Sequence, residues 1–233
     1  MKKVAIVQSC YIPWKGYFDL IRSMDHFVLY DAVQFTKRDW RSRNKIKTPQ
    51  GPLWLSIPIS VKGKYHQSIL ESMVSSNEWA DSHWKSILYN YKKAPHFNDY
   101  CDRFNQLYIQ NKQEPSLSKI NLNFITAICD MLNIKTPISL STPLKEGLDK
   151  TEQLIYQCQE VGATHYVSGP AAKNYIQQEK FQAANIELSY FEYPKYPVYP
   201  QSYGEFTHEV SVIDLLFHTG QHAMNYIAGI EHE

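Results

Sequence analysis

Two polar segments near the N-terminus combine residue types that could bind a phosphorylated ligand. The first is residues 8–19, where Trp14, Gly16 and Tyr17 follow a short apolar run. Tyr11, Trp14 and Tyr17 could stack on a base or a sugar ring, and Gly16 would let a ligand approach the backbone closely. The alternative is that these aromatic side chains only pack on the following helix. Because binding residues are commonly found on such loops, we favour a ligand site.

The second segment, residues 31–47, is basic. Six basic residues fall between positions 37 and 47 against one acid, Asp39, in a chain of formal net charge +1. Arg side chains can hold a phosphate with two hydrogen bonds, and Lys adds a point charge. Asp31, at the end of an apolar run, could orient a sugar hydroxyl or act as a base. The alternatives are a solvated charged surface and nucleic-acid binding, although one short patch with a single Trp lacks a long basic stripe.

Further candidates lie towards the C-terminus. Ser168, Gly169 and Lys173 surround the predicted start of a helix, where backbone N–H groups favour an anion, although Ser-Gly-Pro also caps helices that bind nothing. Gln201 lies in a Pro-rich stretch that could cover a ligand or a sheet edge. Asp214 falls within an apolar run, and a buried carboxylate must be paired or lie near a site.

Metal and thiol chemistry is less favoured. His218 and His222 have the i, i+4 spacing of metal ligands on a helix, but no third ligand is evident and Gly220 could end the helix between them. We interpret both as ordinary histidines and predict no metal site. Cys10 could be a nucleophile, although a lone buried cysteine is commoner. The four cysteines form no C-x-x-C pair, which is typical of free thiols in a reducing compartment.

The elements that would position these residues follow an α/β pattern. A strand at 3–8, a helix at 18–24 and a strand at 26–31 predict a βαβ unit, whose parallel sheet binds ligands beyond the carboxyl ends of its strands. Further strands are expected at 53–59, 69–74, 138–141, 165–167 and 186–193, and helices at 79–91, 104–107, 117–132, 150–162, 170–178 and 210–226. We predict one α/β domain over residues 1–233, with a mostly parallel Rossmann-like sheet and a helical insertion at 78–135.

Composition argues against a general nucleic-acid-binding protein and against a membrane-spanning or secreted one. The chain has 233 residues, of which 43% are hydrophobic, and its 24 Lys and Arg nearly balance 23 Asp and Glu, which argues against a protein whose whole surface grips nucleic acid. No window approaches the roughly 18 consecutive apolar residues of a membrane helix. The N-terminal apolar run is shorter than the about 7–15 residues of a signal peptide. We expect a cytoplasmic protein.

Several blocks of the chain resemble the WbqC-like protein family. The resemblance is carried by residues 5–21, 30–46, 54–58, 89–97, 199–201 and 211–217, and so covers essentially the whole chain. Members of that family tend to lie in bacterial gene clusters for O-antigen (lipopolysaccharide) and other surface polysaccharides. The resemblance therefore implies work on an activated sugar or its substituent.

The function expected from residues and resemblance is a transferase that acts on a nucleotide-activated (amino) sugar, with acyl or aminoacyl transfer as one form. Asp31 and Asp214 are the predicted catalytic residues. The predicted ligand-binding residues are Gln8, Tyr11, Trp14, Gly16, Tyr17, Gln34, Lys37, Arg38, Trp40, Arg43, Asn44, Ser168, Gly169, Lys173 and Gln201. The ligand is a nucleotide-linked sugar or another phosphorylated small molecule, not nucleic acid, and the cofactor and oligomeric state are left open.

Two other functions stay open. One is a non-catalytic scaffold or binding protein of the same pathway. The other is an ATP-dependent ligase or nucleotidylyl-transferase-like enzyme. That superfamily carries H-x-G-H between strand and helix, whereas Trp14-Lys15-Gly16-Tyr17 keeps only the glycine.

Overall fold

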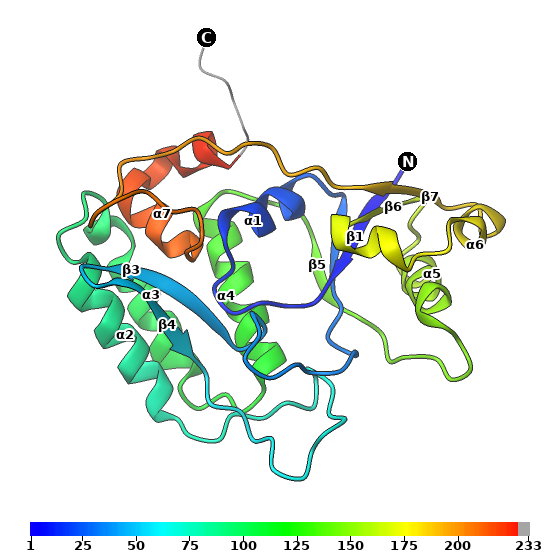
Figure 1. Ribbon diagram of the computed structural model, residues 1–233, viewed down its shortest axis with the longest axis horizontal. Helices are drawn as coiled ribbons and strands as arrows, with labels where there is room; N and C mark the ends of the chain where they lie inside the picture. The colour runs from blue at the N-terminus through cyan, green and yellow to red at the C-terminus, as the bar shows by residue number, and fades with distance from the viewer. Residues whose placement is uncertain (228–233) are drawn as a thin grey trace.

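The computed structural model describes residues 1–227 and is built on a five-stranded sheet in the order β5-β2-β1-β6-β7 (Figure 1). The strands are β1 (Lys3–Val7), β2 (His26–Leu29), β5 (Ile138–Leu140), β6 (His165–Ser168) and β7 (Glu187–Tyr190). Every pair of neighbours in this sheet is parallel. The predicted α/β class with a Rossmann-like parallel sheet is confirmed.

The N-terminal βαβ unit forms as predicted. Val4, Ala5 and Ile6 of β1 are all buried, as expected of a central strand covered on both faces, and α1 (Lys15–Arg22) carries the chain to β2. The sheet then grows on the β2 side to β5, crosses back, and grows on the other side through β6 and β7. The order therefore reverses between β1 and β6, which is where open α/β sheets leave a crevice for a ligand.

A β-hairpin follows β2 where a basic loop was expected. Its strands are β3 (Arg43–Thr48) and β4 (Gly51–Ser56), so a loop is wrong for residues 43–47, while β4 overlaps the strand expected at 53–59. Ile46 and Leu55 are buried on the inner face, while Arg43 and Lys45 lie on the outer face. Alternation of this kind makes a half-buried strand even when its outer residues are basic. The hairpin ends before Pro58, and the predicted strand at 69–74 is reduced to isolated bridges at Met73 and Val74.

Three helices separate the hairpin from β5, as predicted for this part of the chain. They are α2 (Glu78–Tyr91), α3 (Phe97–Asn111) and α4 (Leu117–Met131). They pack with α7 (Val212–Thr219) around a core in which the Phe217 ring contacts those of Phe97 and Phe104. The division of the chain into one domain with an insertion at 78–135 stays a prediction.

The C-terminal third departs from the prediction at two helices. The expected helix at 170–178 is only a 3-10 turn, η1 (Pro170–Asn174), before a short α6 (Gln178–Ala183), whereas α5 (Lys150–Glu160) forms as expected with a capping box at Asp149. The expected helix at 210–226 is interrupted after α7 and continues as the 3-10 helix η2 (Gly220–Tyr226). Gly220 causes the break, because its φ of +58° lies in the left-handed region.

Between β7 and α7 the chain runs irregularly across the molecule. We call residues 191–211 the strap. It has no helix or strand and passes over α1 to reach the hairpin (Figure 1). Pro194, Pro197 and Pro200 favour this extended course, because proline lacks the N–H that regular pairing needs.

Candidate functional site

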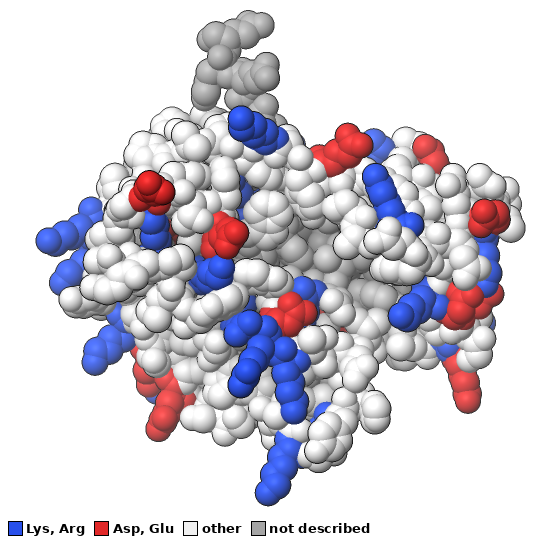
Figure 2. Space-filling model, in the orientation of Figure 1, with Lys and Arg blue, Asp and Glu red and all other residues white. Residues whose placement is uncertain are grey.

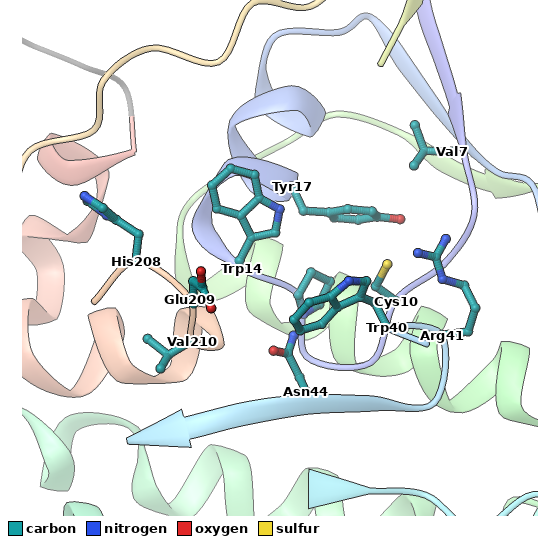
Figure 3. A pocket seen from close by; sticks show the side chains of 11 residues that line it. Val7, Cys10, Trp14, Tyr17, Trp40, Arg41, Asn44, His208, Glu209 and Val210 are labelled. Carbon is teal, nitrogen blue, oxygen red and sulfur yellow. The ribbon is translucent and has the colours of Figure 1, made fainter. Parts of the chain in front are cut away.

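Two adjoining cavities lie at the carboxyl ends of the central strands. The first, here called the aromatic cavity, has a volume of about 510 Å³ and is lined by Val7, Cys10, Pro13, Trp14, Tyr17, Trp40, Arg41, Asn44, His208, Glu209 and Val210 (Figure 3). The second, here called the crevice, has a volume of about 860 Å³ and lies at the point where the strand order reverses. Val7 and Arg41 line both, so the cavities share a wall. Figure 2 shows the molecule hollowed at its centre.

The crevice is built from three strand ends and the segments beyond them. Val7 ends β1, Tyr30 follows β2 and Ser168 ends β6. Its lining also includes polar, cationic and aromatic side chains and one glycine, namely Gln8, Gln34, Arg41, Lys150, Gln153, Tyr175, Tyr193 and Gly169. Such a mixture of aromatic, amide and cationic groups fits a polar ligand with a planar ring.

The two N-terminal segments expected to form a site are bonded directly to each other. The backbone N–H of Tyr11 donates to the carbonyl of Trp40 at 3.0 Å. The Asn44 side-chain amide donates to the carbonyls of Tyr11 and Ile12, at 3.2 and 2.9 Å. A guanidinium N–H of Arg41 donates to Gln8 Oε1 at 2.5 Å. These bonds hold the loop after β1 against the segment that leads into β3.

Arg41 is the cation of the basic segment that reaches the cavities. Its side chain is only 13% exposed, and within residues 1–227 its Nε has no hydrogen-bond partner. The nearest anion, Asp39 Oδ2, lies 3.8 Å from Nε, which is too far for a hydrogen bond. A buried N–H without a partner is costly, so Nε marks a place beside the cavities where a hydrogen-bond acceptor is missing. In Figure 3 the guanidinium, the Tyr17 hydroxyl and the Cys10 thiol converge.

Arg41 was not among the predicted ligand-binding residues, and the cations that were predicted line neither cavity. Lys37 and Arg38 are exposed, with Lys37 Nζ 5.7 Å from the Tyr65 ring centre. Arg43 lies on the outer face of the hairpin with its guanidinium 4.1 Å from the Trp54 ring centre. Lys173 lies over Tyr190 at 5.1 Å. Of the predicted ligand-binding residues, Trp14, Tyr17, Trp40 and Asn44 line the aromatic cavity, and Gln8, Gln34, Ser168 and Gly169 line the crevice.

Tyr11 and Gly16 have structural positions rather than the ligand contacts expected of them. Tyr11 is fully buried, and its hydroxyl is bonded to His83 Nδ1 at 3.0 Å and to the Tyr108 hydroxyl at 2.8 Å. The space above Gly16 is filled by the Trp14 indole, since a Cβ placed on Gly16 would lie 2.4 Å from Cη2 of that ring. Gly16 therefore admits Trp14, which in turn forms the cavity wall.

The two predicted catalytic carboxylates are buried and line neither cavity. Asp31 accepts hydrogen bonds from the Ser9 N–H at 2.8 Å and the Ser118 hydroxyl at 2.5 Å, and burial raises its pKa. Asp214 accepts from the hydroxyls of Tyr91 and Tyr199 and from the amide of Gln201, at 2.8, 2.7 and 2.7 Å. Both groups fix segments that surround the site. Gln201, a predicted ligand-binding residue, has its side-chain amide bonded to Asp214 and Lys47 instead of facing a cavity.

Two buried lysines lie around Asp214. Lys15 Nζ donates to the carbonyl of Pro197 at 3.0 Å and lies 5.2 Å from the ring centres of Tyr196 and Tyr199. Burial lowers the pKa of Lys15 to about 8, and the charge of Asp214 opposes that shift. Lys47 donates to Gln201 Oε1 at 2.8 Å, and burial lowers its pKa as well. This network joins α1, the hairpin, the strap and α7.

The strap supplies residues that the sequence did not single out. Among residues 1–227, His208 Nδ1 is buried without a hydrogen-bond partner, and burial and the charge of Lys15 lower the pKa of His208, so its imidazole is neutral near pH 7. Glu209 pairs with Lys45 at 2.9 Å. Opposite them, burial raises the pKa of the Cys10 thiol to about 11, which makes it a poor nucleophile at neutral pH. No local pattern marks residues 208–210, because the strap has no periodic structure.

Neither ring nitrogen of His218 is open to a metal. Nδ1 lies 2.7 Å from the carbonyl of Asp214, and Nε2 lies 2.8 Å from the Ser202 hydroxyl, while His222 is exposed on η2. Within residues 1–227 no three His, Cys, Asp or Glu side chains are grouped as metal ligands would be. No helix in that same range is both long and apolar enough to cross a bilayer.

Comparison with known proteins places the chain in a family. The model of the WbqC-like protein family matches residues 8–226. A protein of Mycobacterium tuberculosis (strain ATCC 25618 / H37Rv), named "Uncharacterized protein Rv1507c", is 44% identical over 227 residues, which is 97% of this chain and 98% of that protein. No solved structure matches the chain significantly. The chain belongs to the WbqC-like protein family.

Proposed function

We propose that the protein is a cytoplasmic transferase that acts on a nucleotide-activated (amino) sugar in the biosynthesis of O-antigen or another surface polysaccharide. The nucleotide would occupy the crevice and the sugar the aromatic cavity. The observation that carries the proposal is the unsatisfied Arg41 Nε at the wall shared by the two cavities. A diphosphate that links a nucleoside to a sugar would lie at this wall and accept that hydrogen bond.

The position and size of the crevice support a nucleotide. It lies where the strand order of an open parallel sheet reverses, which is the usual place for nucleotides in such folds. Tyr30 and Tyr175 offer ring faces to a base, and Gly169 leaves open space above the backbone of the turn after β6. Its volume of about 860 Å³ falls in the range of about 300–1,000 Å³ that small-molecule sites occupy.

The walls of the aromatic cavity support a sugar. Trp14, Tyr17 and Trp40 present rings to a space of about 510 Å³, next to the polar groups of Arg41 and Glu209. Amphipathic rings of this kind suit a ligand that has apolar faces and hydroxyl edges.

One form of the reaction is acyl transfer to an amino group of the sugar. The amine nitrogen attacks the acyl carbonyl and forms the new amide bond, the bond to the donor's leaving group breaks, and the leaving group takes its electron pair. His208, a neutral imidazole that lines the aromatic cavity, accepts the proton that the amine loses. Asp31 and Asp214 act in this proposal as positioning residues that fix the loop after β1 and the strap.

The first test is binding. Isothermal titration with a panel of nucleotide sugars and the matching free nucleotides should find a ligand for the unmodified protein. Arg41→Ala should weaken the sugar nucleotide by about 10- to 100-fold, because a hydrogen bond to a charged group contributes roughly 1.5–3 kcal/mol. Arg43→Ala is the matched control, since that guanidinium lies against Trp54 and lines neither cavity. Equal losses in both variants, or no bound nucleotide sugar at all, would contradict the proposal.

The second test is turnover. With a bound sugar nucleotide in hand, product formation from acyl and aminoacyl donors can be followed by mass spectrometry. His208→Ala should lower the turnover rate far more than it changes sugar-nucleotide affinity. Tight binding without product from any donor, together with full complementation by the His208→Ala variant in a deletion strain, would favour the non-catalytic scaffold instead.

A further inference from the structure

We propose that the outer face of the hairpin is a docking surface for the headgroups of an anionic phospholipid membrane. The surface, here called the hairpin surface, consists of Trp40, Arg43, Lys45 and Trp54 together with Lys37, Arg38, Lys62, Lys64 and Tyr65, where Lys37 Nζ lies 5.7 Å from the Tyr65 ring centre. It adjoins the aromatic cavity, because Trp40 belongs to both.

The centre of the hairpin surface is a pair of exposed indoles held among cations. The antiparallel register sets Lys45 opposite Trp54, so both side chains lie on the outer face of the hairpin. The ring centres of Trp40 and Trp54 are 5.2 Å apart, and these side chains are 41% and 38% exposed. The Arg43 guanidinium lies 4.1 Å from the Trp54 ring centre. Exposed Trp next to Lys and Arg is typical of proteins that lie at a membrane–water interface.

The charge around the indoles is strongly positive. Residues 37–64 contain eight basic residues and one acid, Asp39, in a chain whose formal net charge is only +1. Lys47 is buried and Arg41 faces the cavities; of the six others, Lys37, Arg38, Lys62 and Lys64 are exposed, and Arg43 and Lys45 are half-buried beside the indoles. Lys45 pairs with Glu209, and among residues 1–227 no acid pairs with the other five. Figure 2 shows Lys and Arg side chains gathered beside the central hollow, on the face where the cavities open.

An anionic membrane fits this surface better than the other partners that a basic patch can bind. A second copy of the chain cannot use the same face, because like charges would meet across a two-fold axis. Binding of a nucleic-acid duplex is favoured by a long stripe of basic residues that follows the phosphates, whereas the cations here surround two apolar rings. A headgroup layer offers both anions to the cations and an interfacial region to the indoles. Docking would bring the mouth of the aromatic cavity to the lipid surface.

Vesicle sedimentation of the full chain, without nucleotide sugar, tests the proposal independently of the proposed function. We expect binding to vesicles that contain about one third phosphatidylglycerol and none to pure phosphatidylcholine, with binding lost as salt is raised. The charge reversal Lys37→Glu with Arg38→Glu should weaken binding by about tenfold or more. Lys92→Glu with Lys93→Glu, an exposed pair beyond the end of α2, is the matched control and should bind like the parent.

Tryptophan emission gives a second readout. Anionic vesicles should shift the emission to shorter wavelength, and Trp54→Ala should reduce that shift; thermal melting checks that each variant is folded. The proposal is overturned if anionic and neutral vesicles bind equally or not at all at low salt, if the charge reversal leaves binding unchanged, or if a DNA or RNA duplex binds more tightly than the vesicles.

Discussion

Gly16 tests whether the wall of the aromatic cavity is understood. A Cβ on this residue would lie 2.4, 2.5 and 2.9 Å from three atoms of the Trp14 indole, where ordinary contacts are about 3.4–4 Å. The ring must therefore move by about 1 Å or more in Gly16→Ala. It packs against Tyr193 and Tyr196, with ring centres at 5.2 and 5.8 Å, and it borders the aromatic cavity, so its displacement breaks these ring contacts and changes the cavity wall.

The expected cost of Gly16→Ala is about 1–3 kcal/mol of unfolding free energy, the usual penalty for forcing extra volume into a packed site. The same substitution made in a Trp14→Ala protein has no ring to displace. There the better helix propensity of Ala in α1 should make it neutral or stabilising by up to about 1 kcal/mol. Urea unfolding of the four proteins in this double-mutant cycle measures the coupling. If Gly16→Ala is equally destabilising with and without Trp14, the account of this wall is refuted.

Three further predictions concern the surroundings of the site. Asp214→Asn should lower the unfolding free energy by about 3–5 kcal/mol, because Lys15 and Lys47 lose their buried counter-charge. The control is Asp130→Asn, which changes an exposed carboxylate. If urea unfolding shows equal losses for both variants, the role given to the Asp214 network is refuted. The pKa of Lys15 is lowered from 10.5 to about 8, so between these pH values the unfolded chain binds more protons and Lys15 makes stability rise with pH. The stability of the parent relative to Lys15→Met should therefore increase by about 1–2 kcal/mol from pH 8 to 9.5 in urea titrations, and a decrease would show that the sign is wrong. Gly220→Ala should lower the melting temperature strongly, because φ is +58° and a Cβ would lie 2.4 Å from His96 Nδ1; adding His96→Ala should recover only the part due to the clash, and full recovery would argue against backbone strain.

The sequence predicted those parts of the fold whose signals are local. The run Val4–Ile6 is apolar at successive positions, and the spacing in α4 is helical, so burial on both faces or on one stripe could be inferred without the tertiary structure. Only the first strand of the hairpin was missed, because the outer positions of β3 are basic and hide an alternation in which only Ile46 is strongly apolar; β4 overlaps the strand expected at 53–59.

The candidate site was less predictable, because side-chain direction decides it. Arg41 and Arg43 are two residues apart in one basic segment, yet one turns to the cavities and the other to Trp54 on the hairpin's outer face. The sequence shows that both cations are present but does not show which of the two side chains points into the cavities. Tyr11 was predicted to contact a ligand, but its side chain points into the core, where its hydroxyl is hydrogen-bonded to His83 and Tyr108.

The strap joins parts of the molecule that the sheet does not. It contributes Tyr193 to the crevice and His208 to the aromatic cavity, yet supplies no strand or helix to the core. Tyr199 and Gln201 of the strap are bonded to Asp214, but exposed positions such as Val198 and Glu205 can change while the sheet folds as before. Under the proposed transferase function, relatives that share this scaffold would differ in the carbohydrate they accept through Tyr193, His208 and the exposed strap positions between them, and these are the residues to exchange when a new preference is wanted.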